Sequence, residues 1–149
     1  MLRDRLIGAW ELVAFESTLA DGRVIAAMGR RAVGSIVYSA DGYVSVNLSH
    51  GGRERGGEGI FWHALDDDVA GPVARRYMAY SGRFEVDEAQ EMARHHFDMC
   101  LDPALIGTLQ ERHIRFEDDM LELSVRRAEG VDNPSRLLWR RFAGAPASE

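Results

Sequence analysis

Hydrophobic and polar residues alternate with a period of two along most of this chain. The segment from Met120 to Arg127 shows the spacing clearly, with Leu121, Leu123 and Val125 at alternate positions. Successive side chains of a β-strand point to opposite faces, so this spacing is typical of strands. We therefore predict strands over residues 10–16, 33–39, 43–49, 80–86, 92–101, 107–117, 120–127 and 136–142.

The connections between these segments are mostly short and polar. Residues 40–42, Ala-Asp-Gly, predict a β-hairpin between two of the strands. About eight strands in series form an antiparallel meander and an all-β fold. Closure into a barrel is the most economical arrangement because it removes exposed strand edges. A two-sheet sandwich is the alternative.

One long insertion interrupts the strands. The stretch HGGRERGGEG, from His50 to Gly59, is rich in glycine and predicts a loop of high conformational entropy. A short helix is predicted from Val69 to Met78, where Gly71-Pro72 suits a first helical turn. We expect the loop and the helix to cover the mouth of the barrel and to admit a ligand when the loop opens. An insertion without function is the alternative.

Length and composition indicate one globular domain. The chain has 149 residues, of which 46% are hydrophobic and 28% charged, close to the average for soluble proteins. We expect a single domain over residues 1–149, with an ordered core over about residues 6–142 and a tail over 143–149.

Strand alternation also predicts which side chains face the interior. In the segment 92–101 the odd positions, beginning with His95 and Phe97, form the more apolar face. In the next strand the same argument places Gln110 and Arg112 inside, near His95. Further side chains predicted to point inward are Tyr80, Phe84, Val86, Met99, Leu101, Ile114, Phe116, Leu121, Leu123 and Val125.

An interior that contains His95, Gln110, Arg112 and Tyr80 is not a plain hydrophobic core. Each unpaired buried polar group costs roughly 1–3 kcal/mol, so several together need partners. These side chains indicate either a satisfied internal network or a solvated ligand cavity.

Several segments of the sequence resemble a known family. Gly8-Ala9-Trp10 near the start and Trp139-Arg140-Arg141 near the end resemble the calycin signature, in which a first-strand Trp packs against an Arg from the end of the barrel. The ordered set LIGAWELVAFE, VGSIVYSADGYVSV, YSGRFEV, HHFDM, GTLQERHIRF and LLWRR, which spans Leu6 to Arg141, is similar to the bacterial and fungal lipocalin-like domain family.

The resemblance implies an eight-stranded lipocalin-like barrel with a ligand cavity. It also implies a setting in small-molecule biosynthesis, which such domains often accompany. No catalytic residue is carried over from the family, because it has no single mechanism to match. The resemblance therefore implies the fold more directly than the function.

Candidate catalytic residues come from the polar interior. Arg112 or Gln110 can hold a carbonyl oxygen while His95 or Tyr80 acts as an acid or a base. Glu16 is expected on the inner face with Trp10, where it would serve as a base or as a partner for Arg112. The alternative is an internal network that satisfies only itself.

Candidate ligand contacts are the remaining inward aromatic and amide side chains together with two residues of the first hairpin. The inward face of that hairpin, which carries Tyr38 and Asn47, is ambiguous because both faces are half apolar. The predicted ligand-binding residues are Trp10, Tyr38, Asn47, Phe84, Phe97, Gln110 and Phe116.

Charge and residue types exclude several classes of function. The formal net charge of −6 argues against nucleic acid and anionic membranes as partners. No Lys is present, which excludes Schiff-base, pyridoxal-phosphate and Walker-lysine chemistry. His95 and His96 point to opposite faces of one strand, so no metal site is predicted, and no cofactor motif is found.

Two functions remain from this reasoning. The first is a binding module that encloses a small hydrophobic or aromatic molecule, with Arg112 and His95 at its polar end. The second is a cofactor-independent isomerase, cyclase or dehydratase that acts on a polyketide-like or terpenoid-like substrate. The start MLRDRLIGAW lacks the apolar stretch of a signal peptide, so a cytoplasmic protein is expected. The expected oligomeric state is a monomer or a homodimer.

Overall fold

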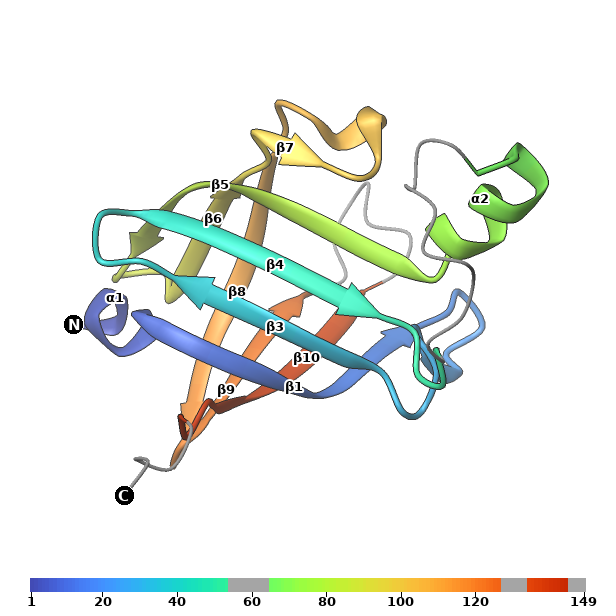
Figure 1. Ribbon diagram of the computed structural model, residues 1–149. Helices are drawn as coiled ribbons and strands as arrows, with labels where there is room; N and C mark the ends of the chain where they lie inside the picture. Colours follow the sequence, from blue (N-terminus) through green and yellow to red (C-terminus); the bar gives the residue numbers. More distant parts are fainter. Residues whose placement is uncertain (54–64, 127–133, 145–149) are drawn as a thin grey trace, which may run out of the picture.

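One antiparallel sheet coils around until its first and last long strands pair with each other (Figure 1). The computed structural model describes residues 1–53, 65–126 and 134–144. Eight strands follow in the order β10-β9-β8-β6-β5-β4-β3-β1, and β10 pairs with β1 to close a barrel. Two short strands are additional, because β2 pairs with β1 and β7 pairs with β5. The predicted antiparallel barrel is confirmed.

The strands and helices have the following bounds. The barrel strands are β1 (Gly8–Thr18), β3 (Val33–Tyr38), β4 (Tyr43–Ser49), β5 (Tyr77–Asp87), β6 (Met92–His96), β8 (Leu109–Glu117), β9 (Met120–Val125) and β10 (Ser135–Arg141), and the additional strands are β2 (Val24–Ala26) and β7 (Met99–Cys100). The helices are α1 (Leu2–Leu6), α2 (Asp67–Ala74) and the short 3-10 helix η2 (Pro103–Leu105).

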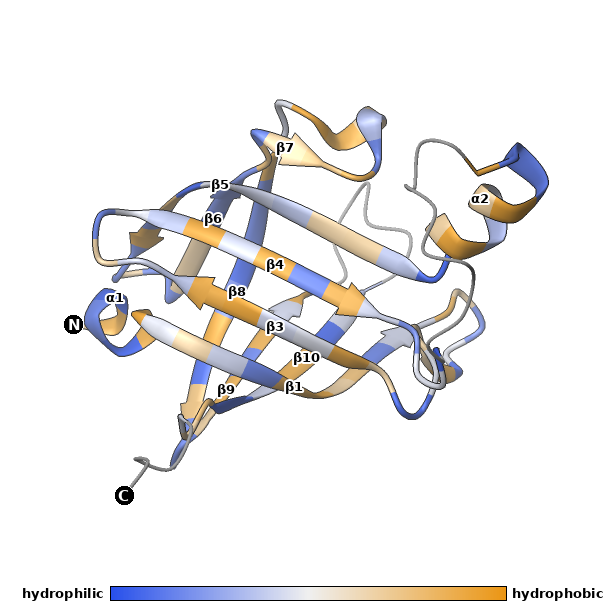
Figure 2. Cartoon of the chain, in the orientation of Figure 1, coloured by the Kyte–Doolittle hydropathy of each residue, from blue (hydrophilic) through white to orange (hydrophobic). Residues whose placement is uncertain are grey.

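The inner face of the barrel follows the predicted alternation in most strands. Figure 2 shows hydrophobic and polar residues alternating along β3 and β4. The buried core contains Leu6, Trp10, Ile36, Tyr38, Val44, Val46, Leu48, Tyr80, Phe84, Ala93, Phe97, Ile114, Leu121, Leu123, Leu137 and Trp139. The inward directions predicted for Tyr80, Phe84, Leu121 and Leu123 are therefore correct.

Strand β1 contains a bulge that reverses its faces. Leu12 lies opposite Trp139, but the register shifts before Ala14, which lies opposite Leu138. The extra residue, Val13, is 45% exposed. A bulge inserts one residue into the pairing, so every later side chain moves to the other face. Phe15 consequently packs against the core.

The predicted strand over residues 92–101 is wrong in its second half. Strand β6 ends at His96, and β7 begins only at Met99, after a break at Phe97 and Asp98. The break ends the alternation, so Met99 and Leu101 are 66% and 45% exposed instead of buried.

Helix α1, which the sequence analysis did not predict, closes one end of the barrel (Figure 1). Leu6 is fully buried there, and its carbonyl oxygen accepts a 2.9 Å hydrogen bond from Trp10 Nε1. The backbone N–H groups of Leu2 and Arg3 donate to the carboxylate of Glu88 at 2.7 and 3.1 Å. These bonds occupy N–H groups that have no partner within the helix itself.

Helix α2 lies at the other end of the barrel from α1 (Figure 1). The helix ends at Ala74, and Tyr77 and Met78 already belong to β5. The predicted extension of the helix to Met78 is therefore wrong. None of its residues is buried. Residues 54–59 of the predicted glycine-rich loop and residues 145–149 of the predicted tail lie outside the described residues. The gate thus remains a prediction. No described helix is long and apolar enough to cross a membrane.

Candidate ligand-binding cavity

The interior of the barrel has a filled half and a hollow half. The filled half lies next to α1, where Leu6, Trp10 and Tyr38 are at most 2% exposed. The hollow half is a cavity of about 160 Å³ toward the end opposite α1. Its lining residues are Phe15, Ile36, Val46, Leu48, Met78, Tyr80, Phe97, Leu105, Gln110, Arg112, Leu123, Ser135, Leu137 and Trp139.

The cavity is mainly apolar, with a small number of polar side chains. Tyr80, Gln110, Arg112, Ser135 and Trp139 supply the polar atoms, and the remaining lining residues are aliphatic, aromatic or Met. An apolar wall with few polar groups is the usual composition of a small-molecule site.

A buried tyrosine–histidine–tyrosine network lies beside this cavity. His95 is fully buried and uses both ring nitrogens, with Nε2 2.8 Å from Tyr38 Oη and Nδ1 3.0 Å from Tyr80 Oη. A neutral imidazole has one donor and one acceptor nitrogen, so one tyrosine donates to it and the other accepts. Of these three residues only Tyr80 lines the cavity.

Burial keeps this network uncharged. Removal from water lowers the pKa of His95 to about 3, and the positive charge of Arg112 contributes further. Burial also raises the pKa of Tyr38 and that of Tyr80, although the charge of Arg112 opposes the rise. At neutral pH the imidazole is therefore neutral and both phenols keep their protons.

Arg112 lies on the inner face of β8, as predicted. It is half-buried and lines the cavity, and its Nη1 donates to the backbone carbonyl oxygen of Glu111 at 2.9 Å. Gln110, two residues earlier, also lines the cavity and donates from Nε2 to Thr108 Oγ1 at 3.0 Å.

The predicted place of Glu16 inside the barrel is wrong. Its side chain is 46% exposed and lies 3.8 Å from Arg136, so the expected pair with Arg112 does not form. The bulge at Val13 explains the error, because it exchanges the positions of Phe15 and Glu16.

Asn47 lies on the outer face of the barrel and does not line the interior cavity, so its predicted ligand contact stays a prediction. Val46 and Leu48 are the inward residues of this part of β4, and Asn47 accepts a 2.8 Å hydrogen bond from Tyr77 Oη on the outer face. Tyr38 does point inward, but it belongs to the network and not to the cavity wall.

The other predicted ligand contacts divide between the two halves of the interior. Phe97 lines the cavity and stacks on Tyr80 with ring centres 3.8 Å apart. Trp10, Phe84 and Phe116 lie outside the cavity lining. The ring centres of Phe116 and Trp10 are 6.0 Å apart, and those of Phe84 and Tyr38 are 4.9 Å apart.

One polar group of the cavity was not predicted from the sequence. Trp139 is 1% exposed, and its Nε1 has no hydrogen-bond partner among the described residues. Trp139 was used only as part of the resemblance. The alternation of β10 could have identified it, because Trp139 shares a face with Leu137.

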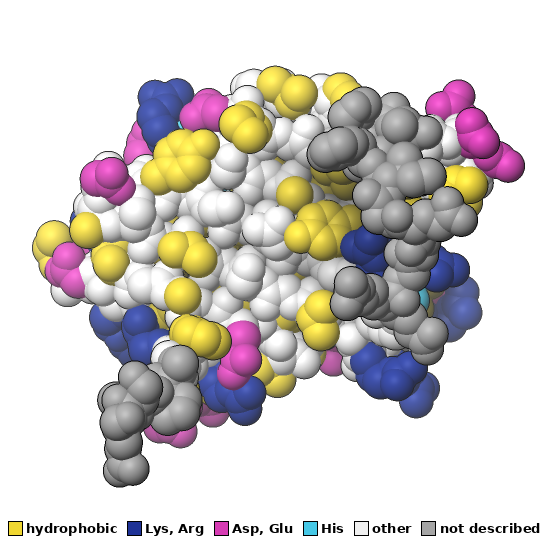
Figure 3. Space-filling model, in the orientation of Figure 1, with side chains coloured by type: hydrophobic (Ala, Val, Ile, Leu, Met, Phe, Trp, Pro, Cys, Tyr) yellow, Lys and Arg dark blue, Asp and Glu magenta, His cyan; other side chains and the backbone are white. Residues whose placement is uncertain are grey.

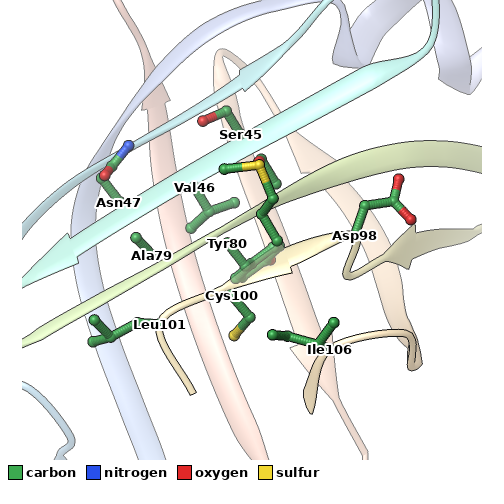
Figure 4. Close-up of a pocket in the computed structure, with 11 residues that line it drawn as sticks. Ser45, Val46, Asn47, Ala79, Tyr80, Asp98, Cys100, Leu101 and Ile106 are labelled. Atoms are coloured by element: carbon green, nitrogen blue, oxygen red, sulfur yellow. The ribbon is translucent and has the colours of Figure 1, made fainter. Parts of the chain in front are cut away.

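A second hollow, of about 500 Å³, lies on the outer surface where β4, β5 and β7 meet (Figure 4). Asn47, Ser45 and Ile106 contribute to it. Its walls include Met99 and Leu101, which are largely exposed, so a molecule there would remain in contact with water. Figure 3 shows the hydrophobic side chains on this face scattered among white atoms. The cavity inside the barrel is the better candidate site.

Metal-ligating side chains do not gather in the part of the chain that the structure describes: no group of three His, Cys, Asp or Glu lies close enough together to hold an ion. His96 instead lies 3.0 Å from a carboxylate oxygen of Glu85 on the outer face.

Comparison with known proteins gives two matches. The model of the family described as "Lipocalin-like domain" matches residues 7–142. The chain is also 34% identical over 91 residues, 55% of its own length and 81% of the relative's, to the 4'-hydroxy-3'-methoxypropiophenone carrier protein ppsC of Aspergillus oryzae (strain ATCC 42149 / RIB 40).

Proposed function

We propose that this chain, which belongs to the lipocalin-like domain family, binds a small aromatic molecule inside its barrel. The observation that carries the proposal is the cavity of about 160 Å³, with its apolar and aromatic wall and its few polar atoms. A concave apolar space attracts a hydrophobic molecule because binding removes apolar surface from water.

The size of the cavity favours a ligand with one aromatic ring. An apolar protein cavity of roughly 150 Å³ holds a benzene molecule. The cavity here is similar in volume, and its lining includes four aromatic side chains that can contact a ring, which are Phe15, Tyr80, Phe97 and Trp139. Substituents on the ring would extend toward Arg112, Gln110 or Ser135.

The related carrier protein supports the same class of ligand. The compound in its name contains one ring, a three-carbon ketone, a hydroxyl group and a methoxy group. We propose a ligand of this kind for the present chain, an aryl ketone or a similar oxygenated aromatic molecule. Tyr80, Gln110 and Arg112 are the proposed anchors for its oxygen atoms.

The alternative, acid–base catalysis by the polar interior, receives little support from the geometry. His95 is separated from the cavity by Tyr80, and its pKa of about 3 makes it a weak base at neutral pH. Glu16, a second proposed base, lies on the outer face. Tyr80 does line the cavity, but burial raises its pKa, so the phenol keeps its proton at neutral pH and is not a base. Binding without a reaction is therefore the function that we propose.

The proposal is tested by calorimetric titration of the purified protein with 4'-hydroxy-3'-methoxypropiophenone. We expect one site per chain. Met78→Trp should weaken binding by roughly tenfold or more, because a bulky ring at this position fills the cavity. Leu109→Trp is the matched control, since Leu109 is 48% exposed and lies outside the cavity lining.

Two results would contradict the proposal. The first is equal binding by both variants, which would place the ligand outside the barrel. The second is chemical conversion of the compound during incubation, detected by chromatography of the recovered ligand, which would favour the enzymatic alternative.

A further inference from the structure

We infer that the cavity selects aromatic molecules with an acidic substituent and binds them as anions, with Arg112 as the opposite charge. The inference rests on the proposed function, because it specifies the class of ligand for the same cavity. Acidic phenols that carry a para-acyl group belong to this class.

The first observation is the charge of Arg112. Among the polar residues that line the cavity, Arg112 is the one that carries a charge. In the described part of the chain no carboxylate forms an ion pair with it; its hydrogen-bond partners are neutral, the carbonyl oxygen of Glu111 and the hydroxyl group of Tyr80. The carboxylate of Glu111 itself is bound by Arg94 at 3.0 Å on the outer face.

The groups that face Arg112 do not compensate this charge. Its positive charge acts on Tyr38 of β3, Tyr80 of β5 and His95 of β6, the titratable side chains beside it. Both tyrosines remain protonated and His95 remains neutral at neutral pH. On the neighbouring strand β6, the residue directly opposite Arg112 is Ala93, which carries no charge. The lining of the cavity thus carries a net positive charge.

The second observation is independent of Arg112. Trp139 Nε1 is buried in the wall of the same cavity and has no acceptor among the described residues. An indole N–H and a guanidinium can only donate hydrogen bonds. Unsatisfied buried donors are uncommon in folded proteins, so this N–H is available to donate to an acceptor atom of a bound molecule.

Together these groups favour a ligand that offers acceptor oxygens and negative charge. The phenolate of a para-acyl phenol shares its charge between the phenol oxygen and the ketone oxygen, so it offers an acceptor at each end. Hydrogen bonds to an ionised partner are stronger than those to a neutral one. Gln110 offers the competing possibility, because its carbonyl oxygen could accept from a neutral phenol while Nε2 binds Thr108.

The experiment compares two probes, 4'-hydroxypropiophenone and its methyl ether, 4'-methoxypropiophenone. The phenol can ionise and the ether cannot. An opposite charge nearby lowers a pKa by roughly one unit or more, so the bound phenol should show phenolate absorbance at a pH where the free phenol is neutral. Near neutral pH the phenol should bind about tenfold more tightly than the ether.

Substitutions assign the effect to one residue. Arg112→Met should abolish both the phenolate absorbance and the preference for the phenol, while Arg112→Lys should retain them because it keeps the charge. Arg115→Met is the matched control, since Arg115 lies on the outer face of the same strand and pairs with Glu117. It should behave like the wild type.

The possible results separate the two proposals. Equal binding of both probes by the wild type, with the phenol neutral when bound, overturns the inference and leaves the proposed function intact. An unchanged spectrum in Arg112→Met also overturns it. Failure of the wild type to bind either probe overturns the inference and the proposed function together.

Discussion

The guanidinium carbon of Arg141 lies 4.0 Å from the centre of the Trp10 ring, and the two residues are also partners in the β1–β10 pairing that closes the barrel. Arg141 further donates from Nη1 to the carbonyl oxygen of Ile7 at 3.1 Å and from Nη2 to that of Arg5 at 2.7 Å. One side chain therefore joins the last strand, the first strand and the end of α1.

We predict that Arg141→Lys lowers the free energy of unfolding by about 1–2 kcal/mol, because an ammonium group cannot make both hydrogen bonds and stack on the indole. Urea unfolding measures the effect. Arg140→Lys is the control, since Arg140 forms an exposed pair with Glu11 and should change stability by less than about 1 kcal/mol. Equal losses in the two variants would show that the Trp10 contact does not stabilise the barrel.

His95 should make stability depend on pH. Burial lowers its pKa from 6.5 to about 3, so between these values the unfolded chain binds a proton that the folded chain does not. The contribution is complete above pH 6.5 and is lost as the pH falls toward 3, with a slope of up to about 1.4 kcal/mol per pH unit. The slope of unfolding free energy against pH should be smaller in His95→Gln and retained in His113→Gln, which keeps His95. Equal slopes in all three proteins would refute this.

Gly82 should tolerate no larger residue. A Cβ atom at this position would overlap the carbonyl oxygen of His96 and come within 2.9 Å of the backbone nitrogen of Asp98. We expect Gly82→Ala to cost about 3 kcal/mol or more, because backbone atoms cannot move aside as a side-chain tip can. Gly71→Ala in α2 meets only the tip of Arg75 at 4.0 Å and should be neutral or slightly stabilising. Thermal unfolding compares the two variants, and a mild effect at Gly82 would show that β5 and the β6–β7 break can separate.

The bulge in β1 gives a paired test of the cavity wall. Phe15→Ala should weaken binding of 4'-hydroxy-3'-methoxypropiophenone by roughly tenfold, because it removes an aromatic side chain that lines the cavity. Glu16→Gln should leave the dissociation constant unchanged, since Glu16 faces Arg136 on the outside. Calorimetry measures both. The reverse result would mean that the bulge is absent from the protein in solution.

The barrel was predictable because strand alternation and turn residues are local signals. The hairpin of β3 and β4, with its turn at residues 40–42, has the predicted bounds to within one residue. The inward positions of Arg112 and Gln110 were predictable for the same reason, because β8 runs without a bulge across both.

The errors have a common physical cause. A single extra residue such as Val13 changes the face of Glu16, yet Val13 is an ordinary strand former and carries no signal of a bulge. The break after His96 likewise has no local signal: the Phe97 N–H still bonds to the carbonyl oxygen of Thr108, the next partner in the β6–β8 register, but the Phe97 carbonyl oxygen accepts from the Gly107 N–H and the pairing ends there. Asn47 was ambiguous because apolar residues occupy both faces of β3, where Val33 and Val37 are exposed.

Helix α1 and the filled half of the barrel have a consequence for exchange kinetics. Because Leu6 and Trp10 occupy the interior at that end, we expect a ligand to enter the cavity from the opposite end, near Met78 and Ser135. A resident molecule must then depart before a second one can occupy the same space. The rate of exchange should equal the dissociation rate of the resident and stay constant as the concentration of a competitor rises. If such a barrel delivers its ligand to an enzyme, it must release the ligand first. The rate of delivery would then equal the rate at which the ligand dissociates from the barrel, whatever the concentration of the enzyme.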